Sequence, residues 1–192
     1  MTATGKIPQD NAADSSPYRQ QVPVLLIVLT AIFMAVIDGT VVNIALPTIT
    51  RYFSVDLADS QWAITAYLVT MTSLLLIFGK LSESLGRARL FFIGIFVFTA
   101  SSLACGLSGN LPELVLFRVM QGTGAAMLFS ISSALIFETT PPDTRGRAMG
   151  YIGSTVAIGS IAGPIVGGFV VDALGWEYIF FINILLCRKP QR

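Results

Sequence analysis

The sequence predicts an all-α fold, a polytopic bundle of helices that cross a membrane. Of its 192 residues, 54% are hydrophobic and only 12% are charged, about half the charged share of an average soluble domain. Apolar stretches of about 20 residues, the length that a helix needs to cross a bilayer, recur along the chain with short polar segments between them. These observations together disfavour a water-soluble domain.

The apolar stretches divide the chain into a tail and a bundle. Residues 1–21 are polar and show no apolar period, so we expect a disordered cytoplasmic tail there. A transmembrane bundle is predicted over 22–187. A cleaved signal peptide is the alternative for the first apolar stretch, but its apolar core would be far shorter. Five full spans are predicted, at about 22–49, 61–81, 90–109, 112–137 and 147–171.

A sixth apolar run, 177–187, is too short to cross a bilayer. Its apolar part runs from Tyr178 to Cys187 and would rise about 15 Å as a helix, half of a hydrocarbon core of about 30 Å. A basic end, 188–192, follows it directly. We therefore expect a truncated sixth helix, and we interpret the chain as an N-terminal fragment of a longer parent or as the product of a truncated or frame-altered gene.

Basic residues predict the orientation, because loops rich in Lys and Arg stay on the cytoplasmic side of a membrane. With the N-terminus inside, the outer loops hold a single basic residue, Arg51. The other loop and tail residues of this kind all fall on the cytoplasmic side: Lys6, Arg19, Lys80, Arg87, Arg89, Arg145, Arg147, Arg188, Lys189 and Arg192. The sequence thus predicts a multi-pass protein of the cell membrane with a cytoplasmic N-terminus.

An internal repeat relates residues 79–93 to residues 168–182, at an offset of 89 residues. It joins GKLSESLGRARLFFI to GFVVDALGWEYIFFI, and Glu83 matches Asp172. The period covers three helices, and because three is odd the two copies must face opposite sides of the membrane, as in the inverted repeats of secondary transporters. Chance similarity between apolar stretches is the alternative. We expect 3+3 inverted repeats.

The residue types exclude several kinds of site. The chain has no histidine, which removes imidazole-based catalysis and imidazole metal sites. Cys105 and Cys187 lie in apolar runs and predict neither a disulfide framework nor a zinc site. Gly122 and Gly124 resemble the start of a dinucleotide fingerprint but follow no strand. We expect no enzyme, no metal and no cofactor, and the net charge of +1 predicts no nucleic-acid partner.

Two charged residues, Asp38 and Arg118, lie inside predicted spans. Each costs about 2.5 to 3.5 kcal/mol at the centre of a lipid-exposed helix, so each must face protein or water. If Pro47 and Pro112 mark the outer ends of their spans, Asp38 is about 14 Å deep and Arg118 about 9 Å deep, which the long Arg side chain can bridge. Helical spacing places Gln121 beside Arg118. We predict a carboxylate that takes up and releases a proton; a static ion pair that fixes helix packing is the alternative.

Two further motifs carry glycines. In the fifth span, small residues recur every four positions beside a proline, which lets another helix approach closely and bends the span; they are Gly150, Gly159, Gly163, Pro164, Gly167 and Gly168. In the loop after the second span, a glycine permits a tight turn among charged groups that can form ion pairs; this motif comprises Gly79, Glu83, Gly86, Arg87 and Arg89. Plain helix packing and a solvated loop are the respective alternatives.

These motifs resemble those of the major facilitator superfamily. The loop GKLSESLGRARLF is similar to the superfamily's motif between helices 2 and 3, LVLFRVMQGTGAA to its helix 4 motif, and GSIAGPIVGG to the helix 5 motif of its antiporters. The stretch IDGTVVNIALP, with WEYIFFIN, resembles the drug:proton antiporters and most of all the fourteen-helix group. The helix 1 motif supplies Asp38, Thr40, Asn43 and Pro47.

The resemblance implies the amino-terminal six-helix half of a major facilitator fold and the proton-coupled efflux of hydrophobic or amphipathic drug-like compounds. Asp38, Arg118 and Gln121 would couple protons to substrate, and the partners would be small molecules, protons, lipid and a missing C-terminal half. Ser84 and Ala88 depart from the family, since they replace basic residues of the loop motif. Export of a native metabolite and a non-transporting membrane fragment are the alternatives, and we expect no efflux from this chain alone.

Overall fold

The computed structural model describes residues 18–187, with side chains described over 22–184, and this part of the chain is all-helical, as the sequence predicts. The predicted basic end 188–192 and most of the predicted tail lie outside the described residues. The helices are α1 (Tyr18–Phe53), α2 (Leu57–Ser60), α3 (Trp62–Leu85), α4 (Arg87–Gly106), α5 (Leu111–Thr139), α6 (Arg145–Ala173) and α7 (Tyr178–Cys187).

Within the described residues, five helical segments are long and apolar enough to cross a membrane, with α2 and α3 forming one of them. Most of the helices extend past the predicted apolar stretches, but α4 ends at Gly106, before the predicted end at 109. The 36 residues of α1 rise about 54 Å, far more than a hydrocarbon core of about 30 Å. Composition marks only the part of a helix that suits lipid, whereas backbone hydrogen bonding continues into the polar flanks.

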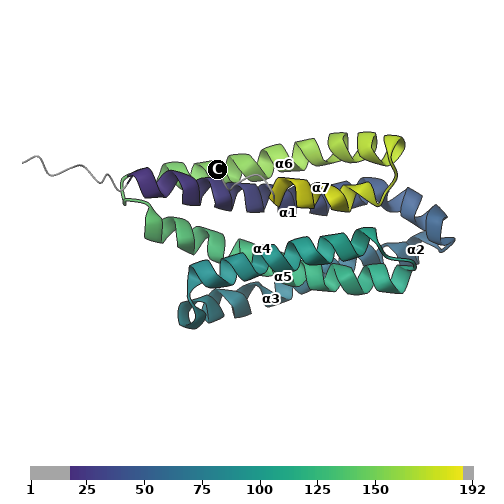
Figure 1. The fold of residues 1–192 in the computed structure, drawn as a ribbon, viewed down its shortest axis with the longest axis horizontal. Coiled ribbons are helices and arrows are strands. Elements are labelled where there is room, and N and C mark those ends of the chain that lie inside the picture. The colour runs from purple at the N-terminus through teal and green to yellow at the C-terminus, as the bar shows by residue number, and fades with distance from the viewer. Residues whose placement is uncertain (1–17, 188–192) are drawn as a thin grey trace, which may run out of the picture.

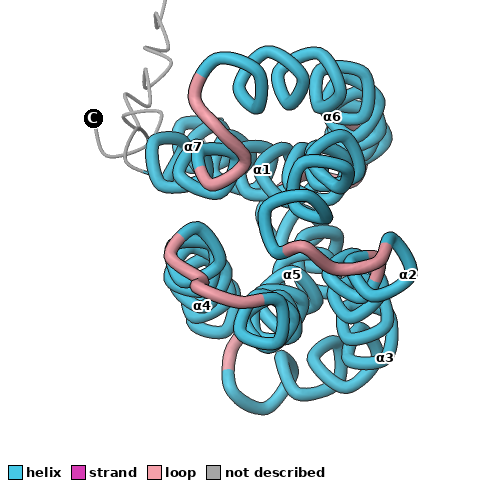
Figure 2. The backbone as a smooth tube through the Cα atoms, turned by 90° about the vertical axis from the view of Figure 1, so that its right-hand side faces the viewer, coloured by secondary structure: helices cyan, strands magenta, loops and turns pink. Residues whose placement is uncertain are grey.

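Apart from the four-residue α2, the helices form two groups of three that lie side by side (Figures 1 and 2). In one group α1 packs along α6 and contacts α7, and in the other α5 packs along α3 and α4. The first helix of each predicted repeat therefore joins the last two helices of the other repeat. This reciprocal exchange is the arrangement expected of two inverted copies. Contacts of α1 with α5 and of α4 with α7 join the two groups.

The matched loops of the repeat lie at opposite ends of the bundle (Figure 1), and each contains a glycine with a positive φ. Gly86 has φ +90° and Gly175 has φ +112°, a region that favours glycine because it has no Cβ. We call the end with Gly86 the basic end; its described bases are Lys80, Arg87, Arg89, Arg145 and Arg147. We call the end with Gly175 the acidic end; its described acids are Asp56, Asp59, Glu113, Asp172 and Glu177.

Candidate functional site

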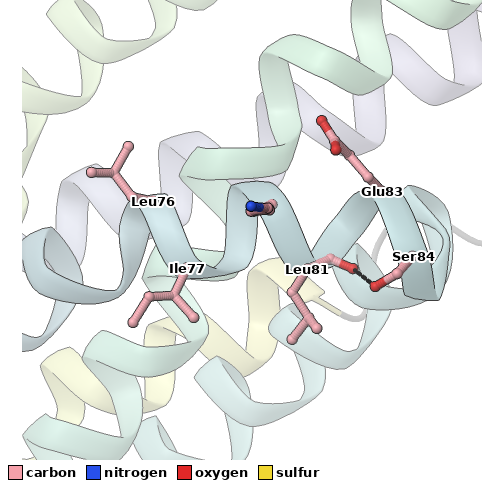
Figure 3. Close-up of a pocket in the computed structure, with 6 residues that line it drawn as sticks. Leu76, Ile77, Leu81, Glu83 and Ser84 are labelled. Atoms are coloured by element: carbon pink, nitrogen blue, oxygen red, sulfur yellow. Dashed lines mark hydrogen bonds between the residues drawn. The ribbon is translucent and has the colours of Figure 1, made fainter.

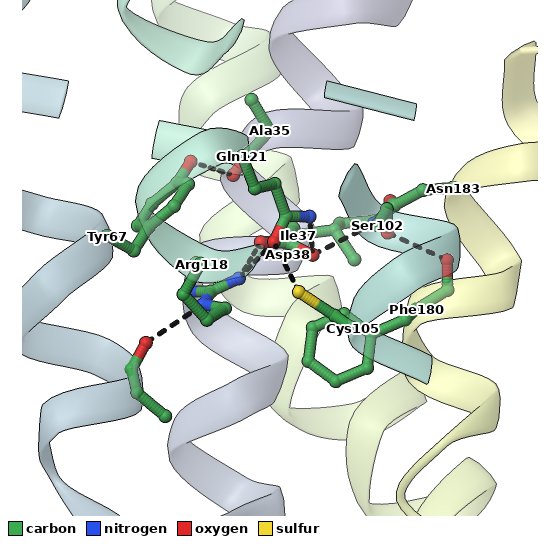
Figure 4. A network of polar contacts seen from close by, with 12 residues as sticks. Ala35, Ile37, Asp38, Tyr67, Ser102, Cys105, Arg118, Gln121, Phe180 and Asn183 are labelled. Carbon is green, nitrogen blue, oxygen red and sulfur yellow. Dashed lines mark hydrogen bonds and ion pairs between the residues drawn. The ribbon is translucent and has the colours of Figure 1, made fainter. Parts of the chain in front are cut away.

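Buried polar side chains gather at the seam between the two groups of helices (Figure 4). Every helix except α2 and α6 contributes to this polar cluster, and each of its side chains is buried. Its members are Asp38, Tyr67, Ser102, Cys105, Arg118, Gln121 and Asn183. The structure therefore brings together the predicted set of Asp38, Arg118 and Gln121, and it adds four residues to them.

The first turns of α5 place Arg118 against two residues of α3. The side chain of Asn110 caps this helix by accepting from the backbone N of Glu113 at 2.9 Å, which satisfies one of the free N–H groups of the first turn. Two turns further along, Arg118 Nε donates to the carbonyl oxygen of Ala63 in α3 at 2.9 Å. The guanidinium lies 4.2 Å from the ring centroid of Tyr67, a cation–π geometry. The cation is thus fixed in place from α3.

Asp38 accepts three hydrogen bonds from side chains. Its Oδ2 accepts from Arg118 Nη1 at 2.6 Å, and both side chains are almost fully buried. Its Oδ1 accepts from Gln121 Nε2 and from Asn183 Nδ2, each at 2.9 Å. All three donors suit an ionised carboxylate, which can only accept. The described geometry is therefore that of a charged Asp38 neutralised by a charged Arg118.

Asp38 can bind one proton, and binding it would remove the ion pair with Arg118. A proton on Asp38 would leave Arg118 without its counter-charge in a buried site, which is costly unless the surroundings rearrange. Arg118 Nη2 already has no hydrogen-bond partner among the described residues. Within residues 18–187, no group of three or more His, Cys, Asp or Glu side chains could hold a metal ion.

The other residues of the helix 1 motif lie outside the polar cluster. Thr40 Oγ1 donates to the carbonyl oxygens of Val36 and Ile37 in its own helix, and Asn43 is exposed and donates to the carbonyl of Gly39. Pro47 is exposed within α1, which continues to Phe53. The helix therefore does not end at Pro47 and tolerates the loss of one N–H donor there, while the outer end of the membrane span stays a prediction. Asp38 lies about 22 Å from the end of α1.

Three glycines of the fifth-span motif form the contact between α6 and α1, and Gly159, Gly163 and Gly167 are all buried. A Cβ on Gly159 would lie 2.9 Å from Val36 Cγ1, and one on Gly163 would overlap Thr40 Oγ1. These glycines pack on the α1 segment that carries Asp38. The rest of the predicted motif lies off this contact: Gly150, Pro164 and Gly168.

Within the part of the chain that the structure describes, the loop motif forms one ion pair at the basic end, and its partner comes from outside the motif. Arg87 Nη1 lies 2.6 Å from Glu138 Oε1 at the end of α5. Glu83 is exposed and lines a shallow hollow of about 710 Å³ along α3 (Figure 3). All residues of that hollow come from one helix, so it is an open face of α3: Leu76, Ile77, Lys80, Leu81, Glu83 and Ser84. Gly79 faces Ser130 of α5, and Arg89 is exposed.

The sequence reasoning did not select Tyr67, Ser102, Cys105 or Asn183 as site residues. A usable signal existed for Asn183, which is the one amide side chain in the apolar run of α7. A lone amide in a membrane helix needs a partner inside the protein. Ser102 and Cys105 gave no such signal, because small polar residues are common in membrane helices.

The model of the Major Facilitator Superfamily matches residues 28–187. The riboflavin transporter RibZ of Clostridioides difficile is 38% identical over 86% of this chain and 36% of its own length. The multidrug export protein EmrB of Haemophilus influenzae is 36% identical over 91% of this chain and 35% of its own, and the tetracenomycin C resistance and export protein of Streptomyces glaucescens is 38% identical over 84% and 30%.

Solved structures of other proteins have a similar fold. The crystal structure of a bacterial homologue of the human lysosomal transporter Spinster, in an inward-facing and occupied conformation, matches with a TM-score of 0.73. The match is 22% identical and covers 93% of this chain and 46% of that one. The chain spans about a third of the length of the curated relatives it matches.

Proposed function

This chain belongs to the major facilitator superfamily, and from that premise we propose that it is the N-terminal part of a transporter that exports hydrophobic or amphipathic compounds in exchange for protons. The buried ion pair between Asp38 Oδ2 and Arg118 Nη1, 2.6 Å apart, carries the proposal. Ionisable residues inside membrane helices are rare and mark ion pathways or proton relays. The pair also lies on α1 and α5, two helices through which the groups contact each other.

In the proposed mechanism, Asp38 takes up a proton from one side of the membrane and releases it to the other. Protonation removes the negative charge, so the buried site changes from a neutral pair to a single uncompensated cation on Arg118. An uncompensated buried charge disfavours the packing that holds it. The protonated and charged states of Asp38 therefore favour different arrangements of the two groups, as alternating access requires. Gln121, bonded to both residues, keeps the pair aligned.

The proposal gives the two glycine motifs different roles. The buried glycine stripe of α6, formed by Gly159, Gly163 and Gly167, lets α6 and α1 move as one unit. Gly159 and Gly163 leave no gap between the two helices. At the basic end, the pair of Arg87 with Glu138 latches α4 to α5 in one conformation. The positive charge of that end supports a cytoplasmic N-terminus for this multi-pass protein of the cell membrane.

The cargo is proposed from the relatives' names. EmrB and the tetracenomycin C protein are named for drug export, which favours drug-like compounds. The riboflavin transporter RibZ supports a second candidate, a native metabolite. Because the chain covers about a third of these relatives, we propose that transport also needs the helices of a C-terminal half, and that the 192-residue chain alone extrudes no dye from vesicles.

The test is efflux driven by a pH gradient, measured with the longer transporter in proteoliposomes. Asp38→Asn should abolish efflux, because a side-chain amide cannot take up and release a proton over the pH range of the experiment. Asp172→Asn, the same change at an exposed site on α6, should leave efflux intact. Proton-coupled efflux that survives Asp38→Asn would contradict the assignment, and extrusion by the 192-residue chain alone would contradict the need for further helices.

A further inference from the structure

A single side-chain amide links α7 to the polar cluster. Asn183 Nδ2 donates to Asp38 Oδ1 of α1 and to Ser102 Oγ of α4, both at 2.9 Å. Ser102 Oγ donates in turn to the carbonyl oxygen of Phe180, also at 2.9 Å. Asn183 and Ser102 are fully buried. These bonds join α1, α4 and α7 at the level of Asp38 (Figure 4).

The two amides that bind Asp38 are held differently. Gln121 Oε1 accepts from Arg118 Nη1 at 2.7 Å, and because a guanidinium can only donate, the Gln121 amide is fixed in one orientation. Asn183 Oδ1 is buried and has no hydrogen-bond partner among the described residues. All the polar contacts of the Asn183 side chain thus pass through Nδ2, and one of its two acceptors there is the Asp38 carboxylate.

The strength of this link depends on the charge of Asp38. A hydrogen bond to an ionised carboxylate is about twice as strong as a bond between neutral groups. A protonated Asp38 can donate to Asn183 Oδ1 only if the amide turns over, and the turned amide gives up its bond from Nδ2 to Ser102. Ser102 Oγ can then donate to Asn183 Oδ1 only if it gives up its hydrogen bond to the carbonyl of Phe180. Each arrangement with a protonated Asp38 therefore holds α7 less tightly.

We propose that Asn183 is the positioning residue that transmits the protonation state of Asp38 to α7. A charged Asp38 holds α7 against α1 through Asn183, and a protonated Asp38 loosens it. This inference rests on the proposed function in one respect only, that Asp38 takes up a proton. It adds a moving element, since among the described residues neither Arg118 nor Gln121 forms a hydrogen bond with α7.

The other titratable and charged groups around Asp38 bear on any pH experiment. Within the cluster they are Arg118 of α5, Tyr67 of α3 and Cys105 of α4. The remaining elements that pack on α1 carry their described charges at their ends, away from Asp38: Asp59 in α2, Arg145, Arg147 and Asp172 in α6, and Glu177 before α7. A protection change that disappears in Asp38→Asn therefore reports Asp38 and none of these groups.

The experiment uses the 192-residue chain in lipid nanodiscs. Infrared spectra recorded across a pH titration follow the protonation of Asp38 directly, when the spectra of Asp38→Asn are subtracted as the reference. Hydrogen exchange, corrected for the intrinsic rate at each pH, gives the protection of the α7 amides across the same range. We expect protection of α7 to fall about tenfold as Asp38 is protonated, the ratio expected when a charge-assisted bond becomes a neutral one.

Three variants separate transmission from mere packing. Asn183→Leu should give, at every pH, the low α7 protection expected for a protonated Asp38. The fall in protection with pH, which we call the step, should be absent, while Asp38 still titrates. Asp38→Asn, which leaves α7 unchanged in sequence, should also show the lower value at every pH. Ser102→Ala breaks the bond to Phe180, so it should lower protection throughout but keep the step.

The outcomes distinguish the two proposals. If Asp38 titrates and α7 protection stays flat, or if Asn183→Leu keeps the step, the role of Asn183 is overturned and the proton site stands. If Asp38 shows no titration, both proposals fail.

Discussion

Arg87 Nη1 lies 2.6 Å from Glu138 Oε1, and this ion pair joins the first residue of α4 to the last turn of α5. The side chains are 28% and 53% exposed, so water weakens the attraction. Exposed pairs contribute about 0.2 to 1 kcal/mol. We predict a coupling energy in this range from a double-mutant cycle of Arg87→Ala and Glu138→Ala, measured by unfolding in mild detergent, and a smaller value at high salt.

The loop motif itself supplies the control. Glu83 is the acid that the sequence places near Arg87, yet it is exposed on α3 and forms no ion pair among the described residues. A cycle of Arg87→Ala with Glu83→Ala should give a coupling near zero. Stronger coupling to Glu83 than to Glu138 would contradict the described geometry.

The stripe of α6 predicts unequal effects for one substitution at two glycines. A Cβ on Gly163 would overlap Thr40 Oγ1, whereas one on Gly168 would meet nothing within 4 Å. We predict that Gly163→Ala lowers the free energy of unfolding by about 1 to 3 kcal/mol, the usual cost of overpacking. Gly168→Ala should be neutral or raise it by up to about 1 kcal/mol, because alanine favours helix. Equal effects at the two sites would contradict the packing of α6 on α1.

The fold could be predicted from composition because the bilayer leaves few solutions. A chain rich in apolar stretches of about 20 residues must form helices, and the offset repeat indicated how the helices pair. The helix ends could not be predicted in the same way. Tyr18 begins α1 inside the predicted tail, and Pro47 does not end it, because hydropathy marks what suits lipid and not where backbone hydrogen bonding stops.

The candidate site could be predicted in part, for a similar reason. Asp38 and Arg118 stood out because isolated charges in a membrane helix must be paired, and their depths suggested that they meet. Asn183 and Ser102 did not stand out. Their contribution comes from the packing of α4 against α7, a relation between segments about 80 residues apart that no local pattern contains. Arg87 was selected, but its partner Glu138 was not, for the same reason.

The distribution of charge predicts which end of the bundle faces the cytoplasm. Ser84 at the basic end and Gln61 at the acidic end are both exposed. With the N-terminus inside, a membrane-impermeant maleimide added to intact cells should label Gln61→Cys and leave Ser84→Cys unlabelled until the membrane is opened. The unsubstituted chain, which carries Cys105 and Cys187, serves as the blank that gives the background labelling. Labelling of Ser84→Cys in intact cells would contradict the predicted orientation.

The ion pair of the polar cluster predicts that one substitution can rescue another. Arg118→Met leaves the Asp38 carboxylate buried without a counter-charge, and breaking a buried pair in this way costs about 3 to 5 kcal/mol. Adding Asp38→Asn removes the stranded charge but keeps the shape, so the double variant should be more stable than Arg118→Met alone. Unfolding in mild detergent at neutral pH measures both. Arg51→Met, the same change at an exposed site on α1, should shift stability by less than about 0.5 kcal/mol.

The same pair predicts a pH dependence with a definite sign. In Arg118→Met the cost arises from a charged Asp38, so acidification, which protonates the carboxylate, should narrow the stability difference between this variant and the parent chain. The double variant of Arg118→Met and Asp38→Asn has no carboxylate at this site. The difference in stability between it and the unsubstituted chain should therefore not narrow in the same way. If Arg118→Met alone costs the same at acidic and neutral pH, or if the double variant is as unstable as the sum of its parts, then Arg118 does not act as the counter-charge of Asp38.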